Sequence, residues 1–208
     1  MKIQTRLLSV RDPSWLEVAL DALQGGGLVA FPTDTVYGVG ALAFDGDAVK
    51  RIYRAKGRSG EKSIPILVGG WEQVVLVGSP SEPAARLASA FWPGPLTIVV
   101  HRNEAVPGAI GPGETVGVRA PDHPVALDLL RSAGPLATSS ANRSGEANAT
   151  IAAEVVGALG GRIAVIVDGG KCPGGRPSTV VDCTGLEPVL LREGPVSFER
   201  IQAVWSRP

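Results

Sequence analysis

Short apolar segments that alternate with segments of helical period constrain this chain more than any other feature. Apolar runs such as Leu28–Phe31 and Leu96–Val100 are typical of buried strands. Asp45–Lys56 and Ser81–Phe91 carry apolar residues three and four positions apart, which predicts amphipathic helices. Alternating strands and helices indicate the α/β class. Since strands also follow one another closely near both chain ends, we predict a mixed, twisted, largely open sheet with flanking helices.

The expected elements extend along the whole chain. Strands are predicted over Ile3–Leu8, Leu28–Phe31, Ile64–Val68, Leu96–Val100, Thr115–Arg119, Pro135–Ser139, Ile163–Val167, Thr179–Asp182 and Val189–Arg192. Helices are predicted from Asp12 to Leu23 and over Asp45–Lys56, Ser81–Phe91, His123–Ala133, Ile151–Leu159 and Phe198–Trp205. Asp12 is expected to be the N-cap of the first helix, with Pro13 at its first position. We see no repeat or linker, and therefore predict one domain over residues 1–208.

Composition excludes several classes of protein. Lys plus Arg equal Asp plus Glu at 20 each, so no long-range basic field points to nucleic acid or membrane. Two cysteines and two histidines predict neither a disulfide framework nor a zinc site. The N-terminal residues lack the pattern of a signal peptide, and no apolar run reaches the roughly 18 residues of a membrane span. We expect a soluble cytoplasmic protein without a membrane partner.

Four polar segments are candidates for a ligand site: three lie where predicted strands begin or end, which is where ligands gather in α/β folds, and one lies at the end of a predicted helix. They are Pro32–Gly38, Lys50–Arg58 with Lys62 beyond it, Thr138–Asn142, and a tail series of Asp168–Gly170, Pro177–Asp182 and Leu191–Pro195. Each also has a structural interpretation, as a turn, a solvated helix end, an N-cap or a surface ion pair. Arg119 ends a strand and suits either a substrate carboxylate or a solvated edge. These patterns alone indicate an α/β domain with an anion site.

Eight short blocks occur in a fixed order between residues 12 and 200: PTDTVYG, KGR, FWPGPLT, TVGVRAP, TSSAN, DGG, PSTVVD and LLREGP. Together they resemble the YrdC-like family, whose enzymes are threonylcarbamoyl-AMP synthases. The resemblance implies a twisted sheet curved around a basic cavity. It also implies a nucleotidyltransferase in which L-threonine and bicarbonate form a carbamate that attacks the α-phosphate of ATP, with Mg²⁺ present. Downstream transfer proteins then modify the adenosine next to the anticodon of tRNA.

The resemblance also implies roles for particular residues. The K-x-R motif supplies Lys56 and Arg58 as catalytic groups. The implied threonine contacts are Thr35, Tyr37, Arg119, Thr138 and Ser178. The implied nucleotide contacts are Arg58, Lys62, Thr115, Ser140, Asn142, Asn148 and Arg192. Because the carbamate itself attacks phosphorus, catalysis requires positioning and charge neutralisation rather than a protein nucleophile or a metal-ligand cluster.

Two alternatives remain open at this stage. The first is a non-catalytic module that binds double-stranded RNA or tRNA through a basic concave surface. The second is the YrdC-like part of a hydrogenase-maturation carbamoyltransferase, against which the lack of a CxxC pair counts. The sequence departs from the family after Arg58, where Ser59-Gly60-Glu61 replaces the usual proline, and this predicts a more mobile loop near Lys62. It also ends after the family's core domain, so we expect no regulation by a second domain.

Overall fold

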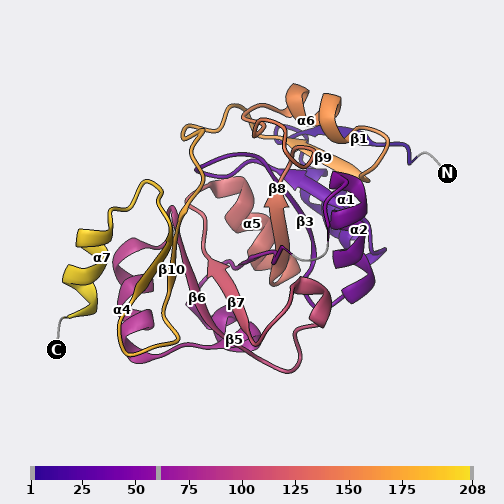
Figure 1. The fold of residues 1–208 in the computed structure, drawn as a ribbon. Coiled ribbons are helices and arrows are strands. Elements are labelled where there is room, and N and C mark those ends of the chain that lie inside the picture. Colours follow the sequence, from indigo (N-terminus) through magenta and orange to yellow (C-terminus); the bar gives the residue numbers. More distant parts are fainter. Residues whose placement is uncertain (1–2, 60–61, 207–208) are drawn as a thin grey trace.

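A single open sheet crosses the protein in the computed structural model, which describes residues 3–59 and 62–206 (Figure 1). The strands are β1 (Arg6–Ser9), β2 (Val29–Phe31), β3 (Gly38–Leu42), β4 (Ile66–Leu67), β5 (Gly78–Ser79), β6 (Leu96–Arg102), β7 (Thr115–Arg119), β8 (Leu136–Ser140), β9 (Val165–Asp168), β10 (Thr179–Asp182) and β11 (Val189–Arg192). Their order is β1-β9-β2-β3-β8-β4-β7-β6-β10-β11, with β5 paired to β6. Parallel and antiparallel pairs both occur, which confirms the predicted mixed sheet.

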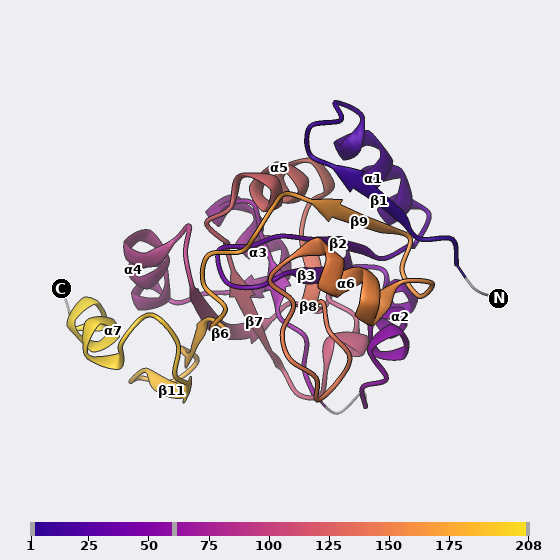
Figure 2. The same cartoon turned by 90° about the horizontal axis from the view of Figure 1, so that it is seen from above.

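Helices flank this sheet. They are α1 (Trp15–Gln24), α2 (Gly46–Lys56), α3 (Val74–Val77), α4 (Glu82–Phe91), α5 (Pro124–Ala133), α6 (Ala152–Leu159) and α7 (Phe198–Trp205), with short 3-10 turns at Trp71–Gln73 and Gly108–Ile110. Figure 2 shows α1 and α5 on one side of the sheet and α2 and α6 on the other. No helix of the described residues is both long and apolar enough to cross a membrane.

The packing of β2 shows how the two faces form. Val29 and Phe31 join the buried cluster under α1 and α5, whereas Ala30 joins the cluster that includes the buried side chains of α2 and α6. Successive strand residues point to opposite faces, so a strand buried on both sides is apolar throughout. This is why the Leu28–Phe31 run predicts a strand although it shows no polar alternation.

Several predicted elements need correction. The first helix begins at Trp15 with Ser14 as its N-cap, so the assignment of Asp12 as the cap was wrong. The Asp12 carboxylate instead accepts bonds from the backbone N–H and hydroxyl of Ser14, which holds a turn before the helix. The sequence pattern also does not predict β3, a glycine-rich strand. The loop predicted after Arg58 includes Gly60 and Glu61, which lie outside the described residues.

Candidate active site

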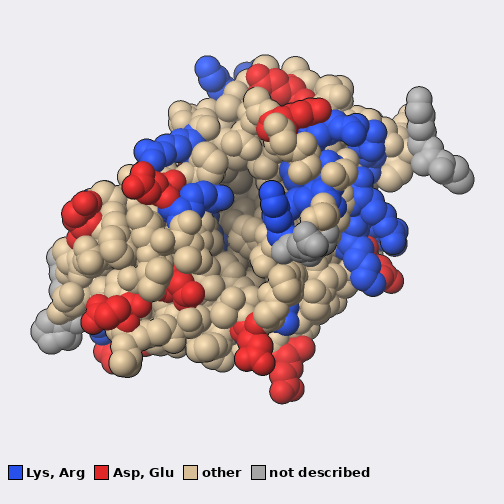
Figure 3. Space-filling view, in the orientation of Figure 1, with Lys and Arg blue, Asp and Glu red and all other residues tan. Residues whose placement is uncertain are grey.

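A basic pocket of about 240 Å³ opens where β3, β7 and β8 meet the β10–β11 hairpin. In Figure 3 it is the hollow near the centre, with Lys and Arg side chains on both sides. Its lining residues are Thr33, Thr35, Val36, Tyr37, Gly38, Arg58, Ser63, Pro65, Leu67, Thr97, Arg119, Thr138, Ser139, Ser140, Asn148, Pro177, Ser178 and Arg192. Three of these are arginines and none is acidic, so among the described residues the lining is wholly cationic or neutral. Such a site favours anionic ligands.

Arg119, the last residue of β7, is held rigidly at one wall. Its Nε donates to the Gly94 carbonyl at 3.0 Å, and its Nη1 donates to Thr35 Oγ1 at 3.1 Å. Its Nη2 forms an ion pair with the mostly buried Asp34. Only 6% of Arg119 is exposed. A guanidinium has five N–H donors, so two remain for a ligand in an already fixed orientation.

The turn between β2 and β3 presents Thr35 to Arg119. The hydroxyl of Thr33 donates to the Val36 carbonyl at 2.7 Å and accepts the backbone N–H of Thr35 at 3.1 Å. The hydroxyls of Thr33 and Thr35 lie 3.0 Å apart. This is the hydroxyl-to-backbone pattern of a tight turn, which confirms the turn interpretation of this segment. Because Thr33, Thr35, Val36, Tyr37 and Gly38 also line the pocket, ligand binding by the same segment stays a prediction.

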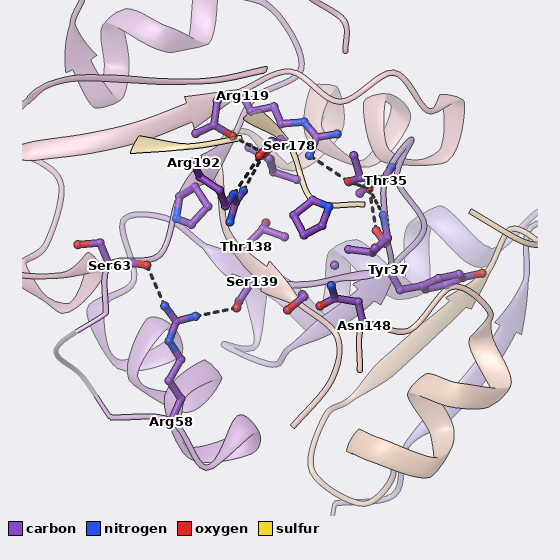
Figure 4. A pocket seen from close by; sticks show the side chains of 18 residues that line it. Thr35, Tyr37, Arg58, Ser63, Arg119, Thr138, Ser139, Asn148, Ser178 and Arg192 are labelled. Atoms are coloured by element: carbon purple, nitrogen blue, oxygen red, sulfur yellow. Dashed lines mark hydrogen bonds between the residues drawn. The ribbon is translucent and has the colours of Figure 1, made fainter. Parts of the chain in front are cut away.

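Arg192 and Ser178 form the wall nearest the β10–β11 hairpin (Figure 4). Arg192 donates from Nε to the Ser178 carbonyl at 3.0 Å and from Nη2 to Ser178 Oγ at 3.1 Å. Ser178 Oγ also lies 2.8 Å from Thr97 Oγ1 on the neighbouring strand β6. The residue before β10 and the last residue of β11 are thus joined, and a second guanidinium is fixed at the pocket.

Arg58 supplies the third guanidinium from the other side. Helix α2 ends at Lys56 and is capped by Gly57, whose positive φ of 62° is a left-handed conformation suited to glycine. This turns the chain toward the pocket. Arg58 Nη1 donates to Ser139 Oγ at 3.1 Å, and Nη2 donates to the Ser63 carbonyl at 3.1 Å. Its Nε is buried without a partner among the described residues.

Lys56 lies behind the pocket and not in its lining. Only 3% of it is exposed. Its Nζ donates to the Ser140 carbonyl, to the Asn142 carbonyl at 2.6 Å and to Asn142 Oδ1 at 3.3 Å. These three acceptors match the three N–H groups of an ammonium. Burial, and secondarily the charge of Arg58, lower the pKa of Lys56 to about 8.

Asn142 completes this support of the turn that follows β8. Its side-chain amide donates to the Arg143 carbonyl at 3.0 Å and to the Glu146 carbonyl at 2.7 Å. Together, Lys56 and Asn142 fix the backbone on which Ser139 and Ser140 reach the pocket. In this structure the side chains of Lys56 and Asn142 therefore bond to protein groups and do not line the pocket.

The structure brings most of the predicted site residues together. Those that line the pocket are Thr35, Tyr37, Arg58, Arg119, Thr138, Ser140, Asn148, Ser178 and Arg192. The hydroxyl of Tyr37 donates to the Gly170 carbonyl at 2.7 Å, so its single O–H donor is already used. Lys62 contributes its backbone carbonyl to Arg58 and Tyr53, and Thr115 begins β7 opposite His101, at the far end of the strand from Arg119.

Sequence reasoning missed several hydroxyl groups at the site. Thr33 and Ser139 sit inside motifs that were recognised, and Thr97 ends the FWPGPLT block, so attention to every hydroxyl of each block would have found them. Ser63 follows the departure from the family pattern and carries no such signal. Asp34 was seen within its motif, but its pairing with Arg119 depends on the fold.

Neither cysteine suits nucleophilic chemistry. Cys172 and Cys183 are buried. Burial raises the pKa of the Cys172 thiol to about 11 and that of the Cys183 thiol to about 12. Within the described residues no group of three or more His, Cys, Asp and Glu side chains could hold a metal ion. The chemistry available at the pocket is therefore anion binding, charge neutralisation and hydrogen bonding through hydroxyls.

Known proteins share both this sequence and this fold. A threonylcarbamoyl-AMP synthase of Pyrococcus abyssi is 45% identical over 206 residues, covering 96% of this chain and 61% of that protein. A putative threonylcarbamoyl-AMP synthase of Mycobacterium tuberculosis is 45% identical over 188 residues, covering 89% of this chain and 87% of that protein. The chain thus spans about three-fifths of the Pyrococcus relative and most of the mycobacterial one.

A solved structure of Pyrococcus abyssi Sua5 complexed with L-threonine superposes with a TM-score of 0.90 at 43% identity, covering 96% of this chain and 60% of that one. Escherichia coli YciO superposes with a TM-score of 0.85 at 24% identity, which supports the fold. The model of the Sua5/YciO/YrdC family, described as "Telomere recombination", matches residues 21–194. This chain belongs to the Sua5/YciO/YrdC family.

Proposed function

We propose that this protein is a nucleotidyltransferase that makes threonylcarbamoyl-AMP and pyrophosphate from L-threonine, bicarbonate and ATP. The observation that carries the proposal is the convergence of Arg58, Arg119 and Arg192 on one pocket lined by hydroxyls and free of carboxylates among its described residues. Relatives from Pyrococcus abyssi and Bacillus subtilis, each 45% identical, are named threonylcarbamoyl-AMP synthase, which supports the same reaction.

The threonine site of this proposal lies at the Arg119 wall. The two N–H groups of Arg119 that the protein does not use are suited to the threonine carboxylate. The hydroxyls of Thr35, Thr138 and Ser178 are suited to the amino and hydroxyl groups of threonine. Tyr37 shapes this wall with its buried ring.

The nucleotide site of this proposal lies between Arg58 and Arg192. Guanidinium groups bind phosphate oxygens with fork geometry, and Ser140 and Asn148 supply neutral hydrogen-bonding groups beside them. Lys62, Thr115 and Asn142 remain proposed nucleotide contacts, although none of them lines the pocket. Because the described lining lacks carboxylates, Mg²⁺ would enter with ATP, held by the phosphates and water.

The reaction needs no protein nucleophile. The amine of threonine and bicarbonate form a carbamate and release water. A carbamate oxygen then bonds to the α-phosphorus of ATP as the bond to the leaving pyrophosphate breaks. Arg58 and Arg192 would neutralise the charge on the phosphates, and Arg119 would hold the threonine end in line, so that positioning and electrostatics lower the barrier.

Lys56 acts in this proposal through the groups it holds. Its ammonium fixes the Ser140 and Asn142 carbonyls, and its charge raises the positive potential beneath the pocket floor. Its place in the K-x-R motif beside Arg58 then reflects two different tasks, a positioning residue followed by a ligand-binding residue.

We also propose a cellular setting for this reaction. The chain of 208 residues works as one domain in the cytoplasm, where ATP, bicarbonate and threonine are present. The product is a mixed anhydride, and transfer proteins that modify the tRNA adenosine next to the anticodon consume it. Direct contact with tRNA or double-stranded RNA is the alternative role for the basic pocket.

The first experiment measures pyrophosphate release from ATP by the purified protein with Mg²⁺ and bicarbonate. L-threonine is compared with L-serine and with no amino acid. Release that depends on threonine, together with an adenylate of threonylcarbamoyl mass, is the expected result. Absence of release with every amino acid, combined with salt-sensitive binding of tRNA, would instead favour the RNA-binding alternative.

A further inference from the structure

A second, larger groove of about 880 Å³ lies between α2 and the turn that joins α6 to β9. It shares no lining residue with the basic pocket. Its lining residues are Ile3, Gly27, Leu28, Arg51, Arg54, Ala55, Gly160, Gly161, Arg162 and Ala164. Figure 3 shows Lys and Arg gathered over the side of the molecule where Figure 1 places α2. The groove is therefore a separate feature of the surface.

The charge of this groove has one sign. Arg51, Arg54 and Arg162 line it, and no Asp or Glu does so among the described residues. Arg51 and Arg54 are three positions apart on α2 and so lie on the same face of the helix. Arg51 donates to the Gly26 carbonyl, whereas the side chains of Arg54 and Arg162 form no hydrogen bond or ion pair with the described part of the chain.

The acidic residues nearest in sequence are already engaged. Asp45 is the N-cap of α2 and accepts the backbone N–H groups of Asp47 and Ala48. Asp47 pairs with Lys50 at 2.9 Å. Arg51 and Arg54 lie near enough to Asp47 for their charges to lower its pKa, but neither forms an ion pair with it in the described part of the chain. A ligand with carboxylates or phosphates would therefore complement the arginines of the groove.

The floor of the groove distinguishes between these two anions. Leu28 and Ala55 line it but are almost wholly buried, whereas the partly exposed Ala164 and the half-exposed Ile3 give it an apolar surface. No aromatic side chain lines the described groove, so a nucleotide base would find no stacking surface. A phosphodiester backbone carries no aliphatic group to cover the floor. A peptide with alternating acidic and aliphatic side chains supplies both complements.

We propose that this groove docks a protein partner through a segment in which aspartate or glutamate residues are interspersed with aliphatic residues. The carboxylates pair with Arg54 and Arg162, and the aliphatic side chains cover Ile3 and Ala164, with the methyl groups of Leu28 and Ala55 directly beneath. The proposal is independent of the reaction at the basic pocket. The protein would then have two binding sites, the basic pocket for small anionic substrates and the α2 groove for a protein partner.

The test uses the methyl-labelled 208-residue protein and nuclear magnetic resonance. Three probes are titrated separately: a synthetic peptide of alternating glutamate and leucine, the same peptide with serine for leucine, and single-stranded polyuridylate. We expect saturable shifts of the Leu28, Ala55 and Ala164 methyl signals with the first peptide only. The Arg54→Ser/Arg162→Ser double variant should bind that peptide at least about tenfold more weakly.

A matched control removes the same amount of charge elsewhere. Arg11 and Arg200 are exposed and line neither the groove nor the basic pocket, so Arg11→Ser/Arg200→Ser should bind the peptide like the wild type. Methyl signals remote from the groove verify that each variant is folded. Peptide binding that leaves the groove methyls unmoved, or that is equal in both double variants, overturns the proposal. Equal affinity for the serine peptide, or stronger groove binding by polyuridylate, also overturns it.

Discussion

At the scale of single residues, the three arginines of the basic pocket have different protein partners. Replacing each of them by alanine should therefore change the kinetics of the reaction in a different way. Arg119 is fixed beside Thr35, whereas Arg58 reaches across to Ser139. We expect Arg58→Ala to lower turnover by about a hundredfold or more, since a charge-stabilising group is removed. Arg119→Ala should mainly raise the KM for threonine. Pyrophosphate release measured over both substrate concentrations checks the difference, and a loss confined to ATP affinity in Arg119→Ala would refute its role.

Lys56 offers a second prediction, which concerns pH. Its pKa of about 8 in the folded protein lies below the value of about 10.4 in an unfolded chain. Between these two values the unfolded state binds more protons, so the Lys56 contribution to the free energy of unfolding rises with pH. In Lys56→Met this contribution is absent. The difference between the wild-type and variant free energies of unfolding should therefore increase in favour of the wild type from about pH 8 to about pH 10.

Urea unfolding of both proteins at several pH values measures this difference. Arg54→Met on the exposed face of the same helix is the matched control, because it also removes a cation from α2. Its difference from the wild type should stay flat across the same window. A flat difference for Lys56→Met as well would show that Lys56 does not titrate there.

At the scale of elements, the loop between β9 and β10 presses against the turn that carries Thr35. A methyl group added at Gly174 would lie 2.8 Å from the Asp34 carbonyl oxygen and 3.1 Å from Thr35 Cα. Backbone atoms cannot yield as a flexible side chain does, so Gly174→Ala should displace one segment from the other. We expect the KM for threonine to rise by about tenfold or more and the melting temperature to fall.

The control for Gly174→Ala is Gly157→Ala in α6, where an added methyl group meets no atom within 4 Å. Alanine is favoured over glycine in a helix interior by about 1 kcal/mol, so this variant should melt at the same or a higher temperature and keep normal turnover. Unchanged threonine kinetics in Gly174→Ala would mean that the loop does not shape the threonine site.

Much of the element structure is predictable from the sequence, because local patterns decide it. The strands Thr115–Arg119, Thr179–Asp182 and Val189–Arg192 have the predicted bounds, and Phe198–Trp205 is the predicted last helix. Strand β3 is not predictable in this way. Its residues Gly38 and Gly40 disfavour strands locally, and they are accommodated because Thr138 of β8 packs close to both.

The candidate site, like the fold, can be predicted from the sequence only in part. The hydroxyls and arginines of the pocket could be predicted as a set from the motifs. The division of work between Lys56 and Arg58 could not, because it depends on Gly57 ending the helix between them. That left-handed residue sends Lys56 toward the buried turn after β8 and Arg58 toward the pocket. Two cations that are neighbours in one motif thus occupy different environments.

At the scale of the whole molecule, the numbers of basic and acidic residues are equal, but these residues are distributed unevenly over the surface. Lys plus Arg equal Asp plus Glu, yet the lining of the basic pocket and that of the α2 groove each contain three arginines and no acidic residue among the described residues. Figure 3 shows Asp and Glu at the top, left and bottom of that view but not inside the hollow. Net charge therefore excludes a uniformly basic protein but says nothing about local anion sites, which depend on how the fold groups its side chains.

The order of the strands bears on how the molecule unfolds. Strand β9 lies between β1 and β2, and β10 pairs with β6, so each of these C-terminal strands pairs with strands that lie far away in the sequence. Loss of β9 would expose the edges of β1 and β2, and loss of β10 would expose the edge of β6. We therefore expect one cooperative unfolding transition for the 208-residue chain, as small single domains show.

The tryptophans report on distant parts of this structure. Trp15 begins α1 and Trp205 ends α7. Trp71 and Trp92 lie between these two in the sequence, and their ring centroids are 6.1 Å apart. In urea, tryptophan fluorescence and far-ultraviolet circular dichroism should give coincident curves with one midpoint. Variants with Phe in place of all but Trp15, or all but Trp205, would follow each end separately. In each variant the fluorescence midpoint is compared with the circular dichroism midpoint. If the two midpoints differ in either variant, that end of the chain unfolds independently and the chain contains two folding units.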